Sequence, residues 1–208
     1  MNYFSNFPKV LTTDYKGNSI LLTNIMNRVE IIPSLLKNPL LFYNYNIQDS
    51  DRPDIVADKY YNDSYMYWLV LFANQIINPK RDWPLTSQQF ESHIIEKYTE
   101  AAGGSNVLAY MQSTLYEYRK IITTKDSDSL KSTVRTIVID EATFNSTIEE
   151  TITQTFPNGY TVSQTIQVRP VSIYDYEVEQ NELKRSINLV NNKYANEFQT
   201  QLHSLLGQ

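Results

Sequence analysis

The sequence predicts a mixed α+β fold, because helix signals and strand signals dominate different parts of the chain. Helix signals occur in three stretches: 51–74, 86–98 and 183–206. Residues of high β propensity are concentrated in three others: 116–122, 135–139 and 152–168. Gly103-Gly104 stops the second helical stretch and is the clearest boundary. We therefore expect four segments, with residues 1–47, 48–104, 105–170 and 171–208.

The opening segment, residues 1–47, is rich in aromatic residues. Residues 14–18, with the sequence Asp-Tyr-Lys-Gly-Asn, are typical of a turn. Thr23-Asn24 predicts the start of a short helix over residues 25–29. Pro33 and Pro39 interrupt the chain, and residues 40–47 then favour a strand.

Residues 51–74 predict two short helices joined by a polar turn. Pro53 suits the first turn of a helix, because its fixed φ is helical and its missing N–H has no partner there anyway. Residues 62–64 provide side-chain oxygens that can cap the second helix. The apolar side chains of this pair predict the core of a small module: Val56, Tyr60, Trp68, Leu69 and Phe72. A rigid connector with Trp83-Pro84 follows, and Thr86 then begins a further helix.

Beyond the glycine pair the sequence favours strands. Residues 152–156 and 160–168 flank Pro157-Asn158-Gly159, which predicts a hairpin with glycine at positive φ. The hairpin is rich in Thr and Gln, so we expect it to face solvent.

The last segment carries an apolar stripe at helical spacing. Its members are Leu183, Ile187, Val190, Tyr194, Phe198, Leu202 and Leu206. The stripe predicts one face of a helix, with a possible break near Asn191-Asn192. Two interpretations stay open: the stripe closes the core of its own domain, or it docks into a helical bundle that another protein supplies.

Composition excludes several classes of function. The formal net charge is −5 and there is no basic cluster, which argues against a nucleic-acid partner. Cysteine is absent, so neither a disulfide nor a thiolate nucleophile can form. The first residues do not resemble a signal peptide, and no apolar run reaches the roughly 20 residues that cross a bilayer.

No pattern predicts catalysis, a cofactor or a metal site. His93 and His203 are the two histidines, and they lie far apart in the sequence. Asp49, Asp51 and Asp54 lack the glycine and terminal glutamate of a calcium loop. The glutamates near 149 and 177–182 are expected to be solvated rather than paired across a catalytic cleft. We therefore expect a protein that is not an enzyme.

Residues 52–84 resemble a LysM-type module of the kind found in phage tail proteins. The features that carry the resemblance are the helix begun by Pro53 with Ala57 and Tyr60-Tyr61, the turn at Asn62-Asp63, Trp68 in an apolar helix, Ala73-Asn74, and Trp83-Pro84.

The larger similarity is to the base plate wedge protein 53 family of contractile-tailed, T-even-like bacteriophages. Its further supports are Thr23-Asn24-Ile25 with Arg28-Val29, Thr86-Ser87-Gln88, Tyr176-Glu177 and the stretch 181–187. Together these features cover about half of the chain, and residues 106–170 lie outside the resemblance.

The resemblance implies a virion protein of the tail baseplate, assembled in the host cytoplasm. Its implied partners are other wedge subunits and neighbouring copies in a sixfold-symmetric assembly, where it would clamp adjacent wedges. On this chain the implied contact residues are Trp83 and members of the terminal stripe: Ile187, Val190, Tyr194, Phe198 and Leu202.

Glycan binding is the alternative that a LysM-type module implies. The sugar groove would lie near residues 47–54 and 74–79. Residues 48–52 are charged and contain no glycine, which departs from the first loop of a sugar-binding module. We therefore expect protein contacts rather than glycan binding.

Overall fold

The computed structural model describes residues 4, 7–27, 29–31, 33–36, 38–104 and 106–206. The fold is α+β, as predicted, and the chain divides into two compact units. Unit 1 comprises residues 1–89 and 181–208, and unit 2 comprises residues 90–180. Unit 2 is therefore an insertion into the chain of unit 1.

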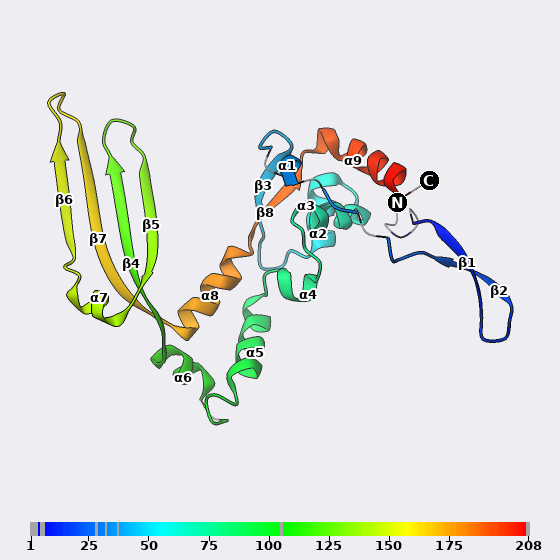
Figure 1. Ribbon diagram of the computed structural model, residues 1–208, viewed down its shortest axis with the longest axis horizontal. Helices are drawn as coiled ribbons and strands as arrows, with labels where there is room; N and C mark the ends of the chain where they lie inside the picture. The colour runs from blue at the N-terminus through cyan, green and yellow to red at the C-terminus, as the bar shows by residue number, and fades with distance from the viewer. Residues whose placement is uncertain are drawn as a thin grey trace. The chain divides into compact units, whose positions relative to one another are not determined.

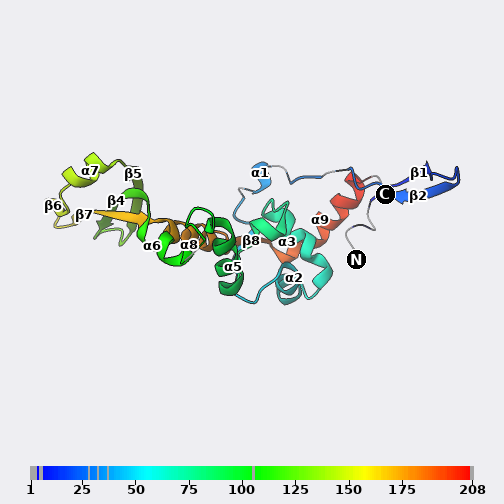
Figure 2. The ribbon, with the colours of Figure 1, turned by 90° about the horizontal axis from the view of Figure 1, so that it is seen from below.

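Unit 1 begins with a two-stranded hairpin, in which β1 (Lys9–Thr13) pairs antiparallel with β2 (Ser19–Thr23). Figures 1 and 2 both show this hairpin as a ribbon of two strands. The helix predicted over residues 25–29 is wrong, because Ile25 and Met26 form a turn, and Arg28 lies outside the described residues. The side chain of Asn24 accepts a hydrogen bond from the Met26 amide, which favours the turn over a helix. A one-turn helix, α1 (Pro33–Leu36), follows.

A strand–helix–helix–strand arrangement forms the centre of unit 1. The strand β3 (Phe42–Asn46) leads into α2 (Pro53–Tyr61), a 3-10 turn at residues 64–66, and α3 (Tyr67–Ala73). The second strand, β8 (Ser186–Val190), comes from the far side of the insertion and pairs antiparallel with β3. Its register places Phe42 opposite Val190.

The strand β8 contradicts the prediction of one helical face running through residues 183–206. Ile187 and Leu189 are buried while Ser186 and Asn188 are exposed, which is the alternation of a strand. The prediction failed because the spacing of the stripe fits a helix locally, whereas β8 forms only against a strand about 140 residues earlier. The predicted break near Asn191-Asn192 is confirmed, because the Asn191 side chain caps the last helix, α9 (Asn192–Leu205).

The helix pair begins and ends where its capping residues predict. Pro53 occupies the first turn of α2, and Asn62 ends the helix with a left-handed φ of 58°. The Asp63 side chain accepts a hydrogen bond from the Tyr65 amide at 2.9 Å and starts the next turn.

The helices α4 (Pro79–Asp82) and α5 (Ser87–Tyr98) follow α3 along the chain. The start of α5 is capped by two reciprocal hydrogen bonds between Thr86 and Gln89, which form a capping box. The Thr86 amide donates to the Gln89 side chain, and the Gln89 amide donates to the Thr86 hydroxyl.

Unit 2 consists of a small helical core and a four-stranded sheet. The helices α5, α6 (Val107–Ser113) and α8 (Ile173–Leu183) enclose Ile94, Val107 and Met111. The sheet is antiparallel, with the strand order β5-β4-β7-β6. Its strands are β4 (Leu115–Asp126), β5 (Ser132–Ile139), β6 (Glu150–Thr155) and β7 (Thr161–Ser172).

The predicted hairpin at Pro157-Asn158-Gly159 is confirmed as the β6–β7 connection, with Gly159 at a φ of 86°. A short helix, α7 (Glu141–Ser146), lies near one end of the sheet, as Figure 1 shows. Its Phe144 ring stacks on Tyr118 of β4 at 4.4 Å between centroids. The strand β6 lies at the edge of the sheet, and every one of its residues is exposed.

Candidate functional site

The β1–β2 hairpin presents apolar side chains on both of its faces. Leu11 is paired with Leu21 on one face, and they are 69% and 59% exposed. Val10 is paired with Leu22 on the opposite face, and both are exposed as well. Every residue of the two strands is exposed. This hairpin was not predicted, although the apolar runs on both sides of the turn at 14–18 are a signal for it.

The hairpin turn is firmly built despite this exposure. The Asp14 carboxylate accepts hydrogen bonds from the Lys16 amide at 2.8 Å and the Asn18 amide at 2.9 Å. The bond from Asn18, more than the others, holds the pKa of Asp14 below its usual value. Gly17 takes a φ of 82°, which only glycine adopts at little cost. The turn predicted at residues 14–18 is thus confirmed.

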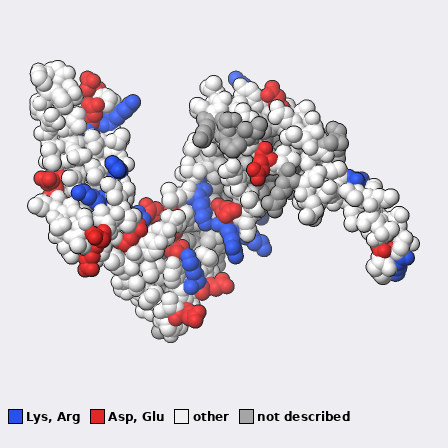
Figure 3. All heavy atoms as spheres, in the orientation of Figure 1, with Lys and Arg blue, Asp and Glu red and all other residues white. Residues whose placement is uncertain are grey.

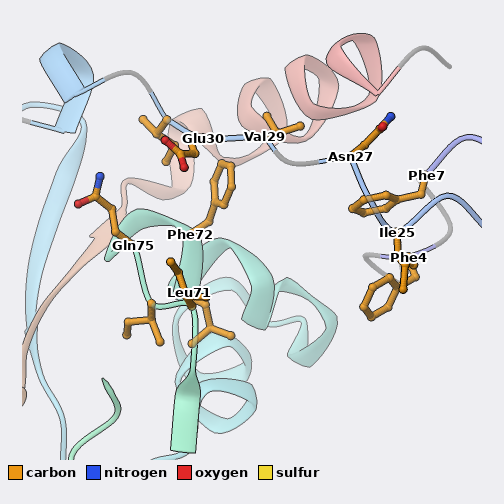
Figure 4. Close-up of a pocket in the computed structure, with 12 residues that line it drawn as sticks. Phe4, Phe7, Ile25, Asn27, Val29, Glu30, Leu71, Phe72 and Gln75 are labelled. Atoms are coloured by element: carbon orange, nitrogen blue, oxygen red, sulfur yellow. The ribbon is translucent and has the colours of Figure 1, made fainter. Parts of the chain in front are cut away.

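An apolar groove lies in unit 1, next to the point where the hairpin begins and ends. It has a volume of about 540 Å³. Figure 4 shows Phe4, Phe7 and Ile25 on one side of it, and Leu71 and Phe72 of α3 on the other. Ile77 also lines the groove and is 81% exposed. The one acidic residue in the described lining is Glu30.

A second, smaller hollow of about 90 Å³ shares part of this wall. Val29, Glu30, Ile31 and Phe72 line both spaces, so the two hollows are neighbours. The far side of the smaller hollow is formed by α9 through Phe198 and Leu202.

A buried aspartate organises the loop between β3 and α2. The Asp51 carboxylate accepts hydrogen bonds from the Tyr45 hydroxyl at 2.7 Å, the Gln48 amide at 3.1 Å and the Lys59 ammonium at 2.5 Å. Burial alone would raise the pKa of Asp51, but these bonds outweigh it and lower the pKa. Burial and the bond to Asp51 raise the pKa of Tyr45 to about 12.

The same loop is held from the C-terminal part of unit 1. The Arg185 guanidinium bonds the Asp49 carboxylate at 2.6 Å and reaches the Ile47 carbonyl at 3.4 Å. Ser87 donates a further hydrogen bond to Asp49. Polar groups at the position expected for a sugar groove are therefore engaged within the chain.

Asn74 ties the end of α3 to the strand β8. Its side-chain amide nitrogen donates to the carbonyls of Val70 and Asn188, both at 2.8 Å. Its side-chain oxygen accepts from the Asn188 amide at 2.8 Å. Asn74 thus satisfies the donor and acceptor of one β8 residue, much as a neighbouring strand would.

Trp83 lies inside unit 1 rather than on an exposed connector. It is 7% exposed, and its indole N–H donates to the Asp51 carbonyl at 2.8 Å. The flanking prolines gave no sign of this burial. The proposed role of Trp83 in an interface stays a prediction, and its contacts here anchor the β3–α2 loop.

Apart from Leu183, which is 65% exposed, the predicted stripe residues and the predicted module core belong to one hydrophobic cluster. Its buried members include Val56, Trp68, Leu69, Ile187, Val190 and Leu202, and its half-buried members include Tyr60, Phe72, Tyr194 and Phe198. The structure therefore brings together two groups that the sequence analysis treated separately. Their role in binding a partner stays a prediction.

Unit 2 adds a second region of exposed apolar side chains. Val134 and Val138 lie four residues apart on one face of β5, and both are more than half exposed.

Tyr116 stacks on Tyr176 at 3.9 Å between ring centroids, and this contact connects β4 to α8.

Charged residues of unit 2 are paired in ways that suit packing. Arg119 is buried between Glu117 and Glu179. Burial disfavours ionised Glu177, but hydrogen bonds from Lys97 and the Tyr98 hydroxyl, both at 2.7 Å, lower the pKa of Glu177. These contacts join α5 to α8 and β4 to α8 within the unit.

The described residues contain no cluster of histidine and carboxylate side chains that could hold a metal ion. Among them, too, no helix has the length and apolar character that crossing a membrane requires.

Comparison with known families shows a match over most of the chain. The model of the family described as Base plate wedge protein 53 matches residues 10–205, which extend over both units. No curated protein matches the chain.

Proposed function

We propose that this chain, which belongs to the base plate wedge protein 53 family, clamps adjacent wedges of a contractile phage tail together. The family is one of structural baseplate proteins, so the chain is a component of the virion tail. The clamp would be non-enzymatic and act through several protein–protein contacts. Assembly would take place in the host cytoplasm, within a sixfold-symmetric ring of wedges.

The observation that carries the clamping role is exposed apolar surface in both units. Unit 1 exposes the hairpin and the groove, and unit 2 exposes Val134 and Val138 on its sheet. Soluble monomers rarely keep large apolar patches in water, and such patches mark protein interfaces. A chain with separate contact regions on two units can bind two neighbours at once, which is what a clamp requires.

The stripe residues divide into two groups under this proposal. Ile187, Val190 and Leu202 are buried, so they would hold the module together. Tyr194 and Phe198 are half-buried on α9, and Leu205 on the same helix is exposed. The outer surface of α9 is therefore our candidate for docking to helices of other wedge subunits.

The LysM-like character of the module is part of the proposal. Its support is the strand–helix–helix–strand order of β3, α2, α3 and β8, in which the two strands pair antiparallel. Glycan binding is the weaker candidate, because internal partners already engage Asp49, Asp51 and Asn74. Sugar hydroxyls would have to displace these bonds.

Reconstitution tests the clamp. The chain is co-expressed with the other baseplate proteins of the same phage, and the products are sized by sedimentation and electron microscopy. We expect separate wedges without the chain and joined wedges with it. Joined baseplates in its absence would refute the clamp.

A sheet variant tests the contribution of unit 2. Val134→Asp with Val138→Asp should reduce joining, because both side chains are exposed on one face of β5. Leu130→Asp is the control, since Leu130 is apolar and 88% exposed but lies outside the sheet, in the connection between β4 and β5. Retention on insoluble peptidoglycan would instead favour the glycan-binding alternative.

A further inference from the structure

We propose that the β1–β2 hairpin of one copy docks into the apolar groove of a second copy, so that copies join head to tail. The inference rests on the proposed function, because a chain of such contacts serves an assembly that places many copies side by side. It adds the two surfaces that meet and the identity of the partner.

The hairpin is built as an element that another molecule covers. A ribbon of two strands is marginally stable in water by itself, and stability normally requires a third strand or a packed face. Here all ten strand residues are exposed, and large apolar side chains occupy both faces. Strands that are apolar on both faces are typical of strands buried on both faces.

The groove has the size and chemistry to receive apolar side chains from such a hairpin. Its volume of about 540 Å³ falls within the range of pockets that enclose small ligands, which is room for a few side chains. Phe4, Ile25 and Ile77 line it and are each more than half exposed. Docking would remove apolar surface from water on the groove and on the hairpin at the same time.

The hairpin cannot fill the groove of its own chain. Phe7 and Ile25, which line the groove, lie just outside the two ends of the hairpin. The Asn24 amide donates to the Pro8 carbonyl at 2.8 Å, which holds these two ends together. The five-residue strands then lead away, and Figure 1 shows β1 and β2 extending as a continuous ribbon. The strands therefore extend from the edge of the groove rather than into it, and the hairpin is available to a second molecule.

Charge favours a second copy as that molecule. The hairpin carries Lys9 at its base and Lys16 in its turn against a single acid, Asp14, within a chain whose formal net charge is −5. Figure 3 shows the hairpin surface as mostly uncharged, with charged side chains near its base and tip. The groove carries Glu30 as its acidic residue. The hairpin, which carries a small net positive charge, would therefore contact the acidic residue Glu30 on a chain of net negative charge.

The two surfaces are different, so the contact is heterologous. Each copy in a pair keeps one unused hairpin or one unused groove, and further copies can add until the rotation closes a ring. A symmetric contact between two hairpins would instead stop at a dimer. This difference makes the proposal testable.

The absence of cysteine makes site-specific cross-linking clean. Three single-cysteine variants of the full chain are made: Leu11→Cys on the hairpin, Ile77→Cys in the groove, and Ile148→Cys as the control. All three positions are exposed, between 69% and 81%, so the substitutions should not disturb folding. Circular dichroism and thermal unfolding check this for each purified variant.

Pairs of variants are mixed over a range of concentrations and treated with a short bismaleimide. We expect strong cross-linking between Leu11→Cys and Ile77→Cys, at least tenfold above the pair of Leu11→Cys with Ile148→Cys. Each variant alone should give little dimer. Equally strong cross-linking of Leu11→Cys with itself would overturn the head-to-tail contact in favour of a symmetric one. A lack of preference for Ile77→Cys at any concentration would also overturn it.

The reconstitution of baseplates separates this inference from the proposed function. If wedges join normally but the specific cross-link does not form, the self-contact is refuted and the clamp is supported. If the specific cross-link forms but the chain does not join wedges, the self-contact is supported and the clamp is refuted.

Discussion

Replacement of Asp51 by alanine should destabilise unit 1 more than the same replacement of Asp54, which lies in the first turn of α2. The Asp51 side chain is 0% exposed and accepts three hydrogen bonds, which join β3, the loop and α2. Alanine removes all three acceptors. The bond from Trp83 survives, because its acceptor is the Asp51 backbone carbonyl.

The expected loss can be bounded from these contacts. A hydrogen bond to a charged group contributes about 1.5–3 kcal/mol, and three of them would suggest well over 4 kcal/mol. The Lys59 side chain is 51% exposed, however, and returns to water when its partner is removed. The Tyr45 hydroxyl and the Gln48 amide regain part of their hydration as well. We therefore expect the free energy of unfolding to fall by about 2–4 kcal/mol.

Asp54→Ala is the matched control. Asp54 pairs with Arg52, but the two side chains are 43% and 71% exposed, so water replaces much of the interaction. The assay is urea unfolding followed by tryptophan fluorescence, which reports on unit 1 because both tryptophans, Trp68 and Trp83, lie there. If Asp51→Ala costs no more than Asp54→Ala, the network is not the restraint that we describe.

The pH dependence supplies an independent check. The pKa of Asp51 is lowered from its ordinary value of 3.8 in the folded chain. A lowered pKa means that ionised Asp51 stabilises the fold fully above about pH 3.8, and that this stabilisation is lost as the pH falls below that value. The difference in unfolding free energy between the native chain and Asp51→Asn should therefore shrink as the pH falls from 5 to 2. A constant difference over that range would contradict the assigned charge state.

Two further predictions concern the architecture of unit 1. In the first, residues 90–180 are replaced by a short glycine–serine linker. Unit 1 should stay folded, and its free energy of unfolding should rise by about 2 kcal/mol, because the loop to be closed becomes much shorter. Loss of the cooperative unfolding transition in tryptophan fluorescence would show that unit 1 needs the insertion. Asn74→Ala should cost about 1–3 kcal/mol in the same urea assay, because it leaves the Asn188 amide and carbonyl without their partner. Asn44→Ala, which removes one exposed bond to Ser186, should cost much less, and equal losses would argue against the strand-like role of Asn74.

Local signals in the sequence were read correctly where a few neighbouring residues decide the structure. Pro53, Asn62 and Asp63 mark the ends of the helix pair, and Gly159 marks the β6–β7 hairpin. The β1–β2 hairpin was missed because its turn was recognised without the flanking strands. The helix expected at residues 25–29 failed because Asn24 stabilises a turn instead.

The sequence by itself determined the α+β class, the helix pair with its caps, and the family. Only the tertiary structure decided that β8 completes the module, that Trp83 is buried against Asp51, and that the terminal stripe from Ile187 onward joins the module core. The groove beside the hairpin likewise emerged only in three dimensions. The reason is physical: caps and turns depend on residues a few positions apart, whereas the burial of Trp83 depends on a partner 32 positions away and the pairing of β8 on a strand about 140 positions away.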